Sequence, residues 1–582
     1  MIRPLIALIV IMFAAAPGAT TSMGLLTQHV GQAPQRPILF NTTVNDPGVV
    51  TTKYYSFSAY QPLVPPVKPD VVWVARDTVF NNTGPRPYTV TVNIPNIEYS
   101  LGLLNVTVRE YGGAQYDRPL YVFANGVPIF WGSTQEIYNS SAVSDITLYE
   151  NMLKGSVTFQ VVLVNYYAAS VGITGVYQVN VSLSLYPGAA PAGLPTTFIP
   201  LWVNGFGYSS VTLNPFTQSY YENVTLPEGT YRLAAVVYTE GGGNDEFWYA
   251  NEPATRSVLL YYNGLLADVV NPYETLYTGG LDLFYWKPMP SINTLSFHNP
   301  YIAELTPLLA TGLNAVIGVS VTNLAEAYEL TGSPFFSWTL SGALALWVNA
   351  SNPLVSGRLT TMKSVYIDSS PIFNPSLSGE VYQEAGHYLL DYAATLVFEH
   401  GQENTQVIQK GTFNAYQTLS TLLESATLNE QFSENAMDTG IYNATLDFEG
   451  SYPVNLVFSA FETPITNPSV IPYKLVYAQN GSLSLGFQTR YVSVYDGQNY
   501  TQSVDEDVLA VGGFSAVIEV INQYGGAVLL SLGSNYAQTA KTLTATWSVN
   551  GQQNTESFRA VAVSPNVTDS SGYYAYLSIS YT

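Results

Sequence analysis

Short segments in which apolar and polar residues alternate constrain the fold of this chain most. Segments of this kind are 88–94, 104–109, 157–164 and 176–185. A period of two places successive side chains on opposite faces of a strand, so each segment predicts a β-strand. The pairs Asn125-Gly126 and Asn263-Gly264 favour two-residue hairpin turns between such strands. We therefore expect an all-β protein of tandem antiparallel β-sandwich or jelly-roll domains, with a further C-terminal β-rich domain.

The composition excludes several classes of protein. The net charge is −22 and the 19 Lys and Arg residues form no basic run, so the chain is not expected to bind nucleic acid. Cysteine is absent, which excludes disulfides and Cys-ligated metals. The four His are scattered without the spacing of a zinc site. We expect a protein that needs neither a metal nor another cofactor.

Proline- and glycine-rich stretches divide the chain. The clearest linker is Pro187–Pro195, and Ala350–Pro353 ends a second strand-rich part. We predict a first jelly-roll domain at 37–190, a second at 191–355 and the C-terminal β-rich domain at 356–582. One segment departs from the strand pattern, because leucines at helical spacing favour a short amphipathic helix over Ala415–Ala436.

The N-terminus has the pattern of an export signal. Arg3 precedes an apolar core over Leu5–Ala16 and a region of small residues, so residues 1–19 are predicted to be a signal peptide. A flexible lead-in is expected over 20–36. The apolar run is short for a membrane span, and the alternative is an uncleaved N-terminal anchor. Recurring Asn-x-Ser/Thr sequons also favour a secreted or cell-surface protein without a stable membrane span in the mature chain.

Two short motifs place acids beside aromatic and turn-forming residues. They are Gln115-Tyr-Asp-Arg118 and Asn244-Asp-Glu-Phe-Trp-Tyr249. Carboxylates can move protons and flat rings can hold a sugar, which are the needs of a carbohydrate-cleaving site. Because the motifs fall in different predicted sandwiches, a cleft between two domains would bring them together.

Four stretches together resemble the peptide:N-glycanase A family in order and spacing. They are 115–136, 175–187, 244–253 and 277–288. The resemblance extends through about residues 50–355 and more loosely to residue 450. It implies two jelly-roll domains with a site at their junction. It also implies a hydrolase, a glycoamidase that cleaves the amide between an N-glycan and an asparagine side chain. The products are an aspartyl peptide and a glycosylamine that loses ammonia to give free glycan. The expected partner is an N-linked glycopeptide or glycoprotein, and the chain is expected to be a monomer.

The same resemblance implies two catalytic carboxylates. Asp117 is the main candidate, either as the base on the attacking water or as the group that donates a proton to the sugar amide. Glu246 is the second candidate, for orienting the inner N-acetylglucosamine or the water. The structural alternatives are that Asp117 pairs with Arg118 or caps a turn, and that Glu246 belongs to a solvated acidic turn.

Further residues are expected to bind substrate at the same site. They are Asp245, Arg118, Trp131, Glu136, Asn165, Trp248, Tyr249 and Trp286. For each tryptophan, a position in the hydrophobic core fits the sequence as well as a position in the binding site. If the segment around Asp245 is extended, it and Glu246 point to opposite sides, and only one faces the cleft. The bacterial glycanases of similar architecture carry an acid where this chain has Asn165, which leaves open whether a third acidic group exists here.

Two other functions fit parts of the sequence. A non-catalytic glycan-binding or cell-surface coat protein would explain the low charge and the many hydroxyl-bearing residues. A glycoside hydrolase would also use two carboxylates, but it would leave a sugar on the asparagine. The joint presence of the Asp117 and Glu246 motifs favours the amidase. An acidic pH optimum is expected, since carboxylates alone must move the protons.

Overall fold

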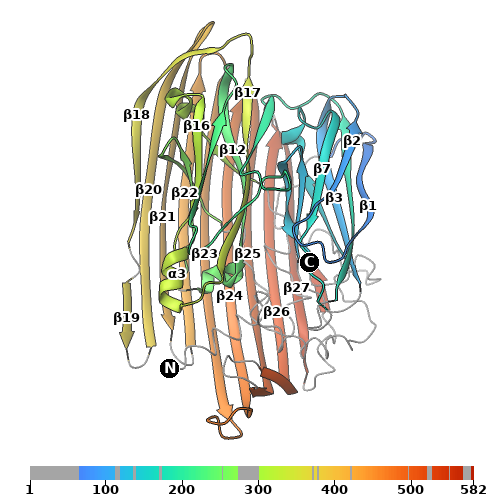
Figure 1. The fold of residues 1–582 in the computed structure, drawn as a ribbon, viewed down its shortest axis with the longest axis vertical. Helices are drawn as coiled ribbons and strands as arrows, with labels where there is room; N and C mark the ends of the chain where they lie inside the picture. The colour runs from blue at the N-terminus through green and yellow to red at the C-terminus, as the bar shows by residue number, and fades with distance from the viewer. Residues whose placement is uncertain are drawn as a thin grey trace.

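The computed structural model is built almost entirely of antiparallel β-sheet, which confirms the predicted all-β class (Figure 1). The described residues are 64–111, 118–134, 139–168, 174–251, 253–272, 300–369, 372–376, 379–419, 423–495, 497–520, 527–549, 551–567 and 578–581. The predicted signal peptide and lead-in lie outside them. Within the described part, no helix is both long and apolar enough to span a bilayer.

The first sandwich consists of two four-stranded sheets. One sheet has the order β1 (Asp70–Phe80), β8 (Val176–Pro187), β3 (Tyr99–Tyr111) and β6 (Asn139–Asp145). The other has the order β2 (Tyr88–Ile94), β7 (Gly155–Leu163), β4 (Pro119–Ala124) and β5 (Val127–Ser133). The predicted hairpin turn joins β4 to β5, with positive φ angles of 50° at Asn125 and 81° at Gly126. Burial alternates along β8 as the sequence pattern predicts, so its apolar side chains enter the shared core.

The second sandwich follows the linker at 188–195. Its first sheet has the order β10 (Val211–Leu213), β17 (Phe336–Val348), β12 (Thr230–Gly243) and β15 (Tyr301–Glu304), with β9 (Thr197–Leu201) also paired to β17. Its second sheet has the order β11 (Ser219–Thr225), β16 (Asn314–Val321), β13 (Val258–Tyr262) and β14 (Leu265–Val270). Strand β12 is buried on both faces. Leu233 and Val237 enter the core of the second sandwich, whereas Val236 and Tyr238 belong to the core of the first. The two sandwiches therefore pack directly against each other through this sheet.

An eleven-stranded sheet forms the rest of the described chain, running from yellow to red in Figure 1. Ten of its strands follow the order β18 (Leu354–Asp368), β20 (Gly379–Phe398), β21 (Gly401–Leu419), β22 (Leu423–Thr439), β23 (Asn443–Pro464), β24 (Tyr473–Tyr495), β25 (Gln498–Val520), β26 (Ala527–Val549), β27 (Gln552–Val567) and β28 (Ser578–Tyr581). The eleventh, β19 (Ile372–Ser376), pairs with β20.

The eleven-stranded sheet covers the two outer strands β14 and β15 of the second sandwich. The Tyr392 hydroxyl donates to the Leu266 carbonyl at 2.6 Å, and the Glu304 amide lies 3.5 Å from Oε1 of Glu434. Side chains from β20, β22 and β23 also join the hydrophobic core of the second sandwich. An uncovered outer strand would expose unpaired backbone groups, so this contact protects both sheets from pairing with other chains.

The predicted helix over Ala415–Ala436 is wrong. The described residues of this segment belong to β21 and β22, which pair antiparallel with Ala415 opposite Leu428. Both strands also have a partner on their other side, β20 and β23. The hydrogen bonds and the buried face supplied by these neighbours outweigh a local leucine spacing.

Candidate functional site

Stacked aromatic rings mark the junction between the two sandwiches. The rings of Tyr121 on β4 and Trp131 on β5 stack with centroids 3.6 Å apart, and Trp131 lies 6.0 Å from Tyr238 on β12. The Tyr121 hydroxyl donates a hydrogen bond to Oε1 of Glu240, also on β12. Strand β4 begins just after Arg118 and β12 ends just before the segment that carries Glu246. The junction therefore joins the strand that follows the first motif to the strand that precedes the second.

Arg118 is held in place by Asn165. Its Nε donates to Oδ1 of Asn165 at 3.1 Å, and its backbone amide donates to the Thr134 hydroxyl at 2.9 Å. Asn165 is fully buried, and its Nδ2 donates to the carbonyls of Phe80 at 3.3 Å and Gly175 at 2.9 Å. The amide of Asn165 thus uses its acceptor for the guanidinium and its donors for the backbone. A carboxylate at this position would lack those donors.

Asp117, Glu136 and Trp286 lie outside the described residues. Arg118 directly follows Asp117 in the chain, and its position is fixed by Thr134 and Asn165. Arg118 is thus the first described residue after Asp117, and β4 begins at the next residue.

Asp245 lies in the 3-10 helix η4 (Asn244–Ala250) and is fully buried. Arg256 binds it through two bonds, Nε to Oδ2 at 2.9 Å and Nη2 to Oδ1 at 2.8 Å. Trp338 Nε1 donates to Oδ2 at 2.6 Å, and Asn251 Nδ2 donates to Oδ1 at 2.7 Å. The segment is helical, not extended. Its two adjacent acids still differ in exposure, since Asp245 is buried and Glu246 is partly exposed. Asp245 anchors the turn that presents Glu246.

Glycines shape the approach to η4. A Cβ atom on Gly241 would lie 2.1 Å from the Asp245 carbonyl oxygen, and one on Gly243 would lie 2.1 Å from that of Phe335. Gly243 also has a φ of 62°, which favours glycine. The chain can turn sharply into η4 only because these residues lack side chains.

Three of the predicted sugar-binding aromatics are core residues in this structure. Trp131, Trp248 and Tyr249 are 1%, 0% and 3% exposed. Trp248 packs edge-on against Trp338 with centroids 6.3 Å apart, inside the core of the second sandwich. Their rings are covered by protein, which agrees with the core alternative that the sequence left open for the tryptophans.

Sequence reasoning missed Glu240. This residue ends the buried part of β12, is partly exposed, and receives the hydrogen bond from Tyr121 of the other sandwich. Burial, and then the charge of Glu240, raises the pKa of Tyr121 well above its ordinary value, so the tyrosine stays a neutral donor. The sequence feature that could have identified Glu240 is its position between an apolar strand and three consecutive glycines. Among the described residues, no three His, Asp or Glu side chains are grouped as a metal site would require.

Comparisons with known proteins agree with the sequence motifs. Residues 67–364, just over half of the chain, match the family described as peptide N-acetyl-beta-D-glucosaminyl asparaginase amidase A. A Prunus dulcis protein, peptide-N4-(N-acetyl-beta-glucosaminyl)asparagine amidase A, is 26% identical over 292 residues, which cover 43% of this chain and 49% of that protein. The chain thus spans about half the length of this curated relative.

Similar solved structures include PNGF-II and peptide:N-glycanase F. A structure of PNGF-II has a TM-score of 0.36 and 15% identity, covering 48% of this chain and 65% of that one. Peptide:N-glycanase F, a glycosylasparaginase from Flavobacterium meningosepticum, has a TM-score of 0.33 and 11% identity, covering 48% of this chain and 96% of that one. Both TM-scores are too low to carry over a fold or a site residue.

Proposed function

The chain belongs to the peptide N-acetyl-beta-D-glucosaminyl asparaginase amidase A family, and on this premise we propose that it is an N-glycan amidase. It hydrolyses the amide between an N-glycan and the asparagine side chain of a glycopeptide or glycoprotein. The products are an aspartyl peptide and a glycosylamine, which loses ammonia to give free glycan. The observation that carries the proposal is the family match over residues 67–364, which includes both acidic motifs.

The proposed chemistry uses two carboxylates. Amide hydrolysis needs a water poised for attack and a proton for the leaving nitrogen. We assign Asp117 to the proton transfer and Glu246 to orienting the inner sugar or the water. The contact between Tyr121 and Glu240 supports this assignment, because it joins the strands that lead into the two motifs. Asn165 supports it as well, because it fixes the guanidinium of Arg118, the residue that follows Asp117 in the sequence.

The setting of this activity is also a proposal. The export-like N-terminus and the sequons favour a secreted or cell-surface enzyme, with residues 1–19 as the signal peptide. The enzyme acts as a monomer on an N-linked glycopeptide or glycoprotein and needs no cofactor.

The test is incubation of the purified protein with an N-glycopeptide at about pH 5, followed by mass spectrometry of the peptide. We expect aspartate in place of the glycosylated asparagine. We also expect folded Asp117→Asn to be inactive, whereas Asp70→Asn, which changes an exposed acid of the same sandwich, should keep full activity.

Other outcomes would identify the two alternatives. A peptide that retains one N-acetylglucosamine would make the protein a glycoside hydrolase. If folded protein leaves several glycopeptides uncut, the glycan-binding or coat function becomes the better account.

A further inference from the structure

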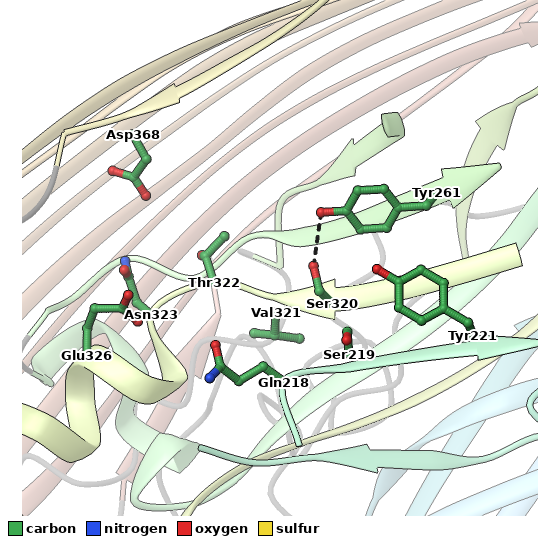
Figure 2. A pocket seen from close by; sticks show the side chains of 10 residues that line it. All are labelled: Gln218, Ser219, Tyr221, Tyr261, Ser320, Val321, Thr322, Asn323, Glu326 and Asp368. Carbon is green, nitrogen blue, oxygen red and sulfur yellow. Dashed lines mark hydrogen bonds between the residues drawn. The ribbon is translucent and has the colours of Figure 1, made fainter. Parts of the chain in front are cut away.

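A polar cavity lies on the second sandwich, on the outer side of the sheet β11-β16-β13-β14. Its volume is about 400 Å³, within the usual range for small-ligand sites. It is bounded by that sheet, by α3 (Leu324–Thr331) and by the end of β18 (Figure 2). The Tyr121–Glu240 junction involves the other sheet of this sandwich, through β12. The cavity therefore lies on the opposite sheet of this sandwich from Glu240.

A glycine lets a tyrosine ring lie flat on this sheet. Gly318 of β16 is directly opposite Tyr221 of β11 on one side and Tyr261 of β13 on the other. A Cβ atom on Gly318 would lie 2.4 Å from Cε1 of the Tyr221 ring. The ring thus rests on the glycine backbone, and Tyr221 is still 53% exposed. Tyr221, Tyr261 and Gly318 together form what we call the tyrosine platform.

Polar groups surround the tyrosine platform. The Tyr261 and Ser320 hydroxyls lie 3.3 Å apart, as the dashed line in Figure 2 marks. The cavity is further lined by hydroxyls, amides and two acids: Gln218, Ser219, Thr322, Asn323, Glu326 and Asp368. These groups can both donate and accept hydrogen bonds. No Lys or Arg is among the described residues that line the cavity, so these residues offer an anionic ligand no counter-charge.

Hydrogen bonds hold Asn323, which lies between β16 and α3 at one side of the cavity. Asn323 has a left-handed backbone with φ of 61°, and its Nδ2 donates to Thr255 Oγ1 at 2.8 Å and to Glu384 Oε1 at 2.7 Å. Burial, with the charge of Glu384, raises the pKa of Asp368 to about 8. At acidic and neutral pH, Asp368 therefore carries a proton and adds little negative charge to the cavity.

We propose that the tyrosine platform is a second carbohydrate-binding site, which takes a neutral sugar residue. An exposed ring face suits the C–H face of a pyranose, and the surrounding hydroxyl, amide and carboxyl groups suit its hydroxyls. This site goes beyond the proposed amidase activity. It binds glycan whether or not the Asp117 site cleaves it.

The test is titration calorimetry and saturation-transfer NMR on the full-length protein at about pH 5, with N,N′-diacetylchitobiose and mannotriose as neutral probes and a uronic-acid disaccharide as the anionic probe. We expect binding of at least one neutral sugar and none of the anionic probe. Tyr221→Ala should weaken that binding by about tenfold or more, as loss of an aromatic anchor does. Gly318→Ala should do the same by pushing the ring off the sheet. Tyr220→Ala is the matched control, because this exposed tyrosine of the same strand pairs with Val319 on the opposite face.

Melting temperatures establish that the variants are folded. The proposal fails if the folded wild type binds neither neutral sugar, or if Tyr221→Ala and Gly318→Ala bind as wild type does. It also fails if binding disappears in Asp117→Asn but persists in Tyr221→Ala, since the sugar would then occupy the amidase site. Because cleavage is measured separately, an inactive protein that still binds sugar through Tyr221 would contradict only the proposed amidase function.

Discussion

Asp245 and Arg256 form an ion pair in which both side chains are 0% exposed, with Nη2 2.8 Å from Oδ1. Nη1 of Arg256 donates to the Pro253 and Thr255 carbonyls. A charge removed from water is tolerated only when its partner and its hydrogen bonds are complete. Here each charge has its partner and further hydrogen bonds, and the pair fixes η4, the turn that carries Glu246, to the start of β13.

We predict that Arg256→Met will lower the free energy of unfolding by about 3–5 kcal/mol, because it leaves Asp245 buried without a counter-charge. Urea denaturation measures this directly. The double variant Asp245→Asn/Arg256→Met should lose less than the two single variants add up to, since neither charge is then left alone. A loss well under 1 kcal/mol in Arg256→Met would mean that the pair does not support η4.

Replacing Asn165 with aspartate is expected to destabilise the first sandwich. The new carboxylate could still face Arg118, but it would set a charge against the Phe80 and Gly175 carbonyls in place of two hydrogen bonds. The expected cost is about 1–3 kcal/mol in urea denaturation. Asn93→Asp, on an exposed position of β2, is the matched control and should change little. Unchanged stability in Asn165→Asp would show that an acid is tolerated at this position.

Glu240 is expected to contribute charge to the proposed amidase site. Glu240→Gln keeps an acceptor for the Tyr121 hydroxyl but removes the negative charge. We predict that kcat on an N-glycopeptide falls by about a hundredfold, with little change in melting temperature. Glu228→Gln, an exposed acid in the same sandwich, should act as wild type. If Glu240→Gln keeps wild-type turnover, the residue only ties the two sandwiches together.

Local sequence signals predicted much of the strand framework. The alternation over 176–185 lies within β8, and Asn263-Gly264 joins β13 to β14 with φ angles of 50° and 79°. Such signals succeed because a strand's inward face and a turn's backbone angles are set by neighbouring residues. They failed at 415–436, where β21 and β22 pair with each other and with β20 and β23 on their outer sides.

Contacts between distant segments could not be predicted in this way. Nothing in the motif around Asp245 indicates that Arg256 will neutralise it, or that Trp338 will donate to it. In the same way, Glu240 resembles any acid at the end of a strand until Tyr121 is placed beside it by the packing of the two sandwiches. Sequence motifs therefore indicated which segments matter, while the role of each acid depends on its long-range partners.

Buried acids gather where the eleven-stranded sheet covers the second sandwich. Acids at most 6% exposed there include Asp268, Glu304, Glu384, Glu403, Glu430, Glu434 and Asp438. Glu304 is paired with Arg232 at 2.9 Å. Burial raises the pKa of Asp268 to about 7, and burial with the charge of Glu304 raises that of Asp438 to about 7. Burial also raises the pKa values of Glu430 and Glu434 well above their ordinary range.

These shifts predict a protein that is most stable in acid. A carboxyl whose pKa is higher in the folded state than its unfolded value of about 4 binds protons more tightly when folded. Its contribution is complete below about pH 4 and is lost as the pH rises toward 7. Between these values, each such carboxyl makes the free energy of unfolding fall by about 1.4 kcal/mol for every pH unit by which the pH rises.

Melting temperatures measured from about pH 4 to about pH 8 should therefore fall as the pH rises. Glu434→Gln should flatten this dependence and raise the melting temperature at the alkaline end, because the neutral amide needs no proton. Glu399→Gln, which alters an exposed acid in the turn between β20 and β21, should leave the curve unchanged. A wild-type melting temperature that is constant or rises over this range would mean that the buried acids are charged in the folded protein. The eleven-stranded sheet would then pack against the second sandwich despite the repulsion between these charged carboxylates.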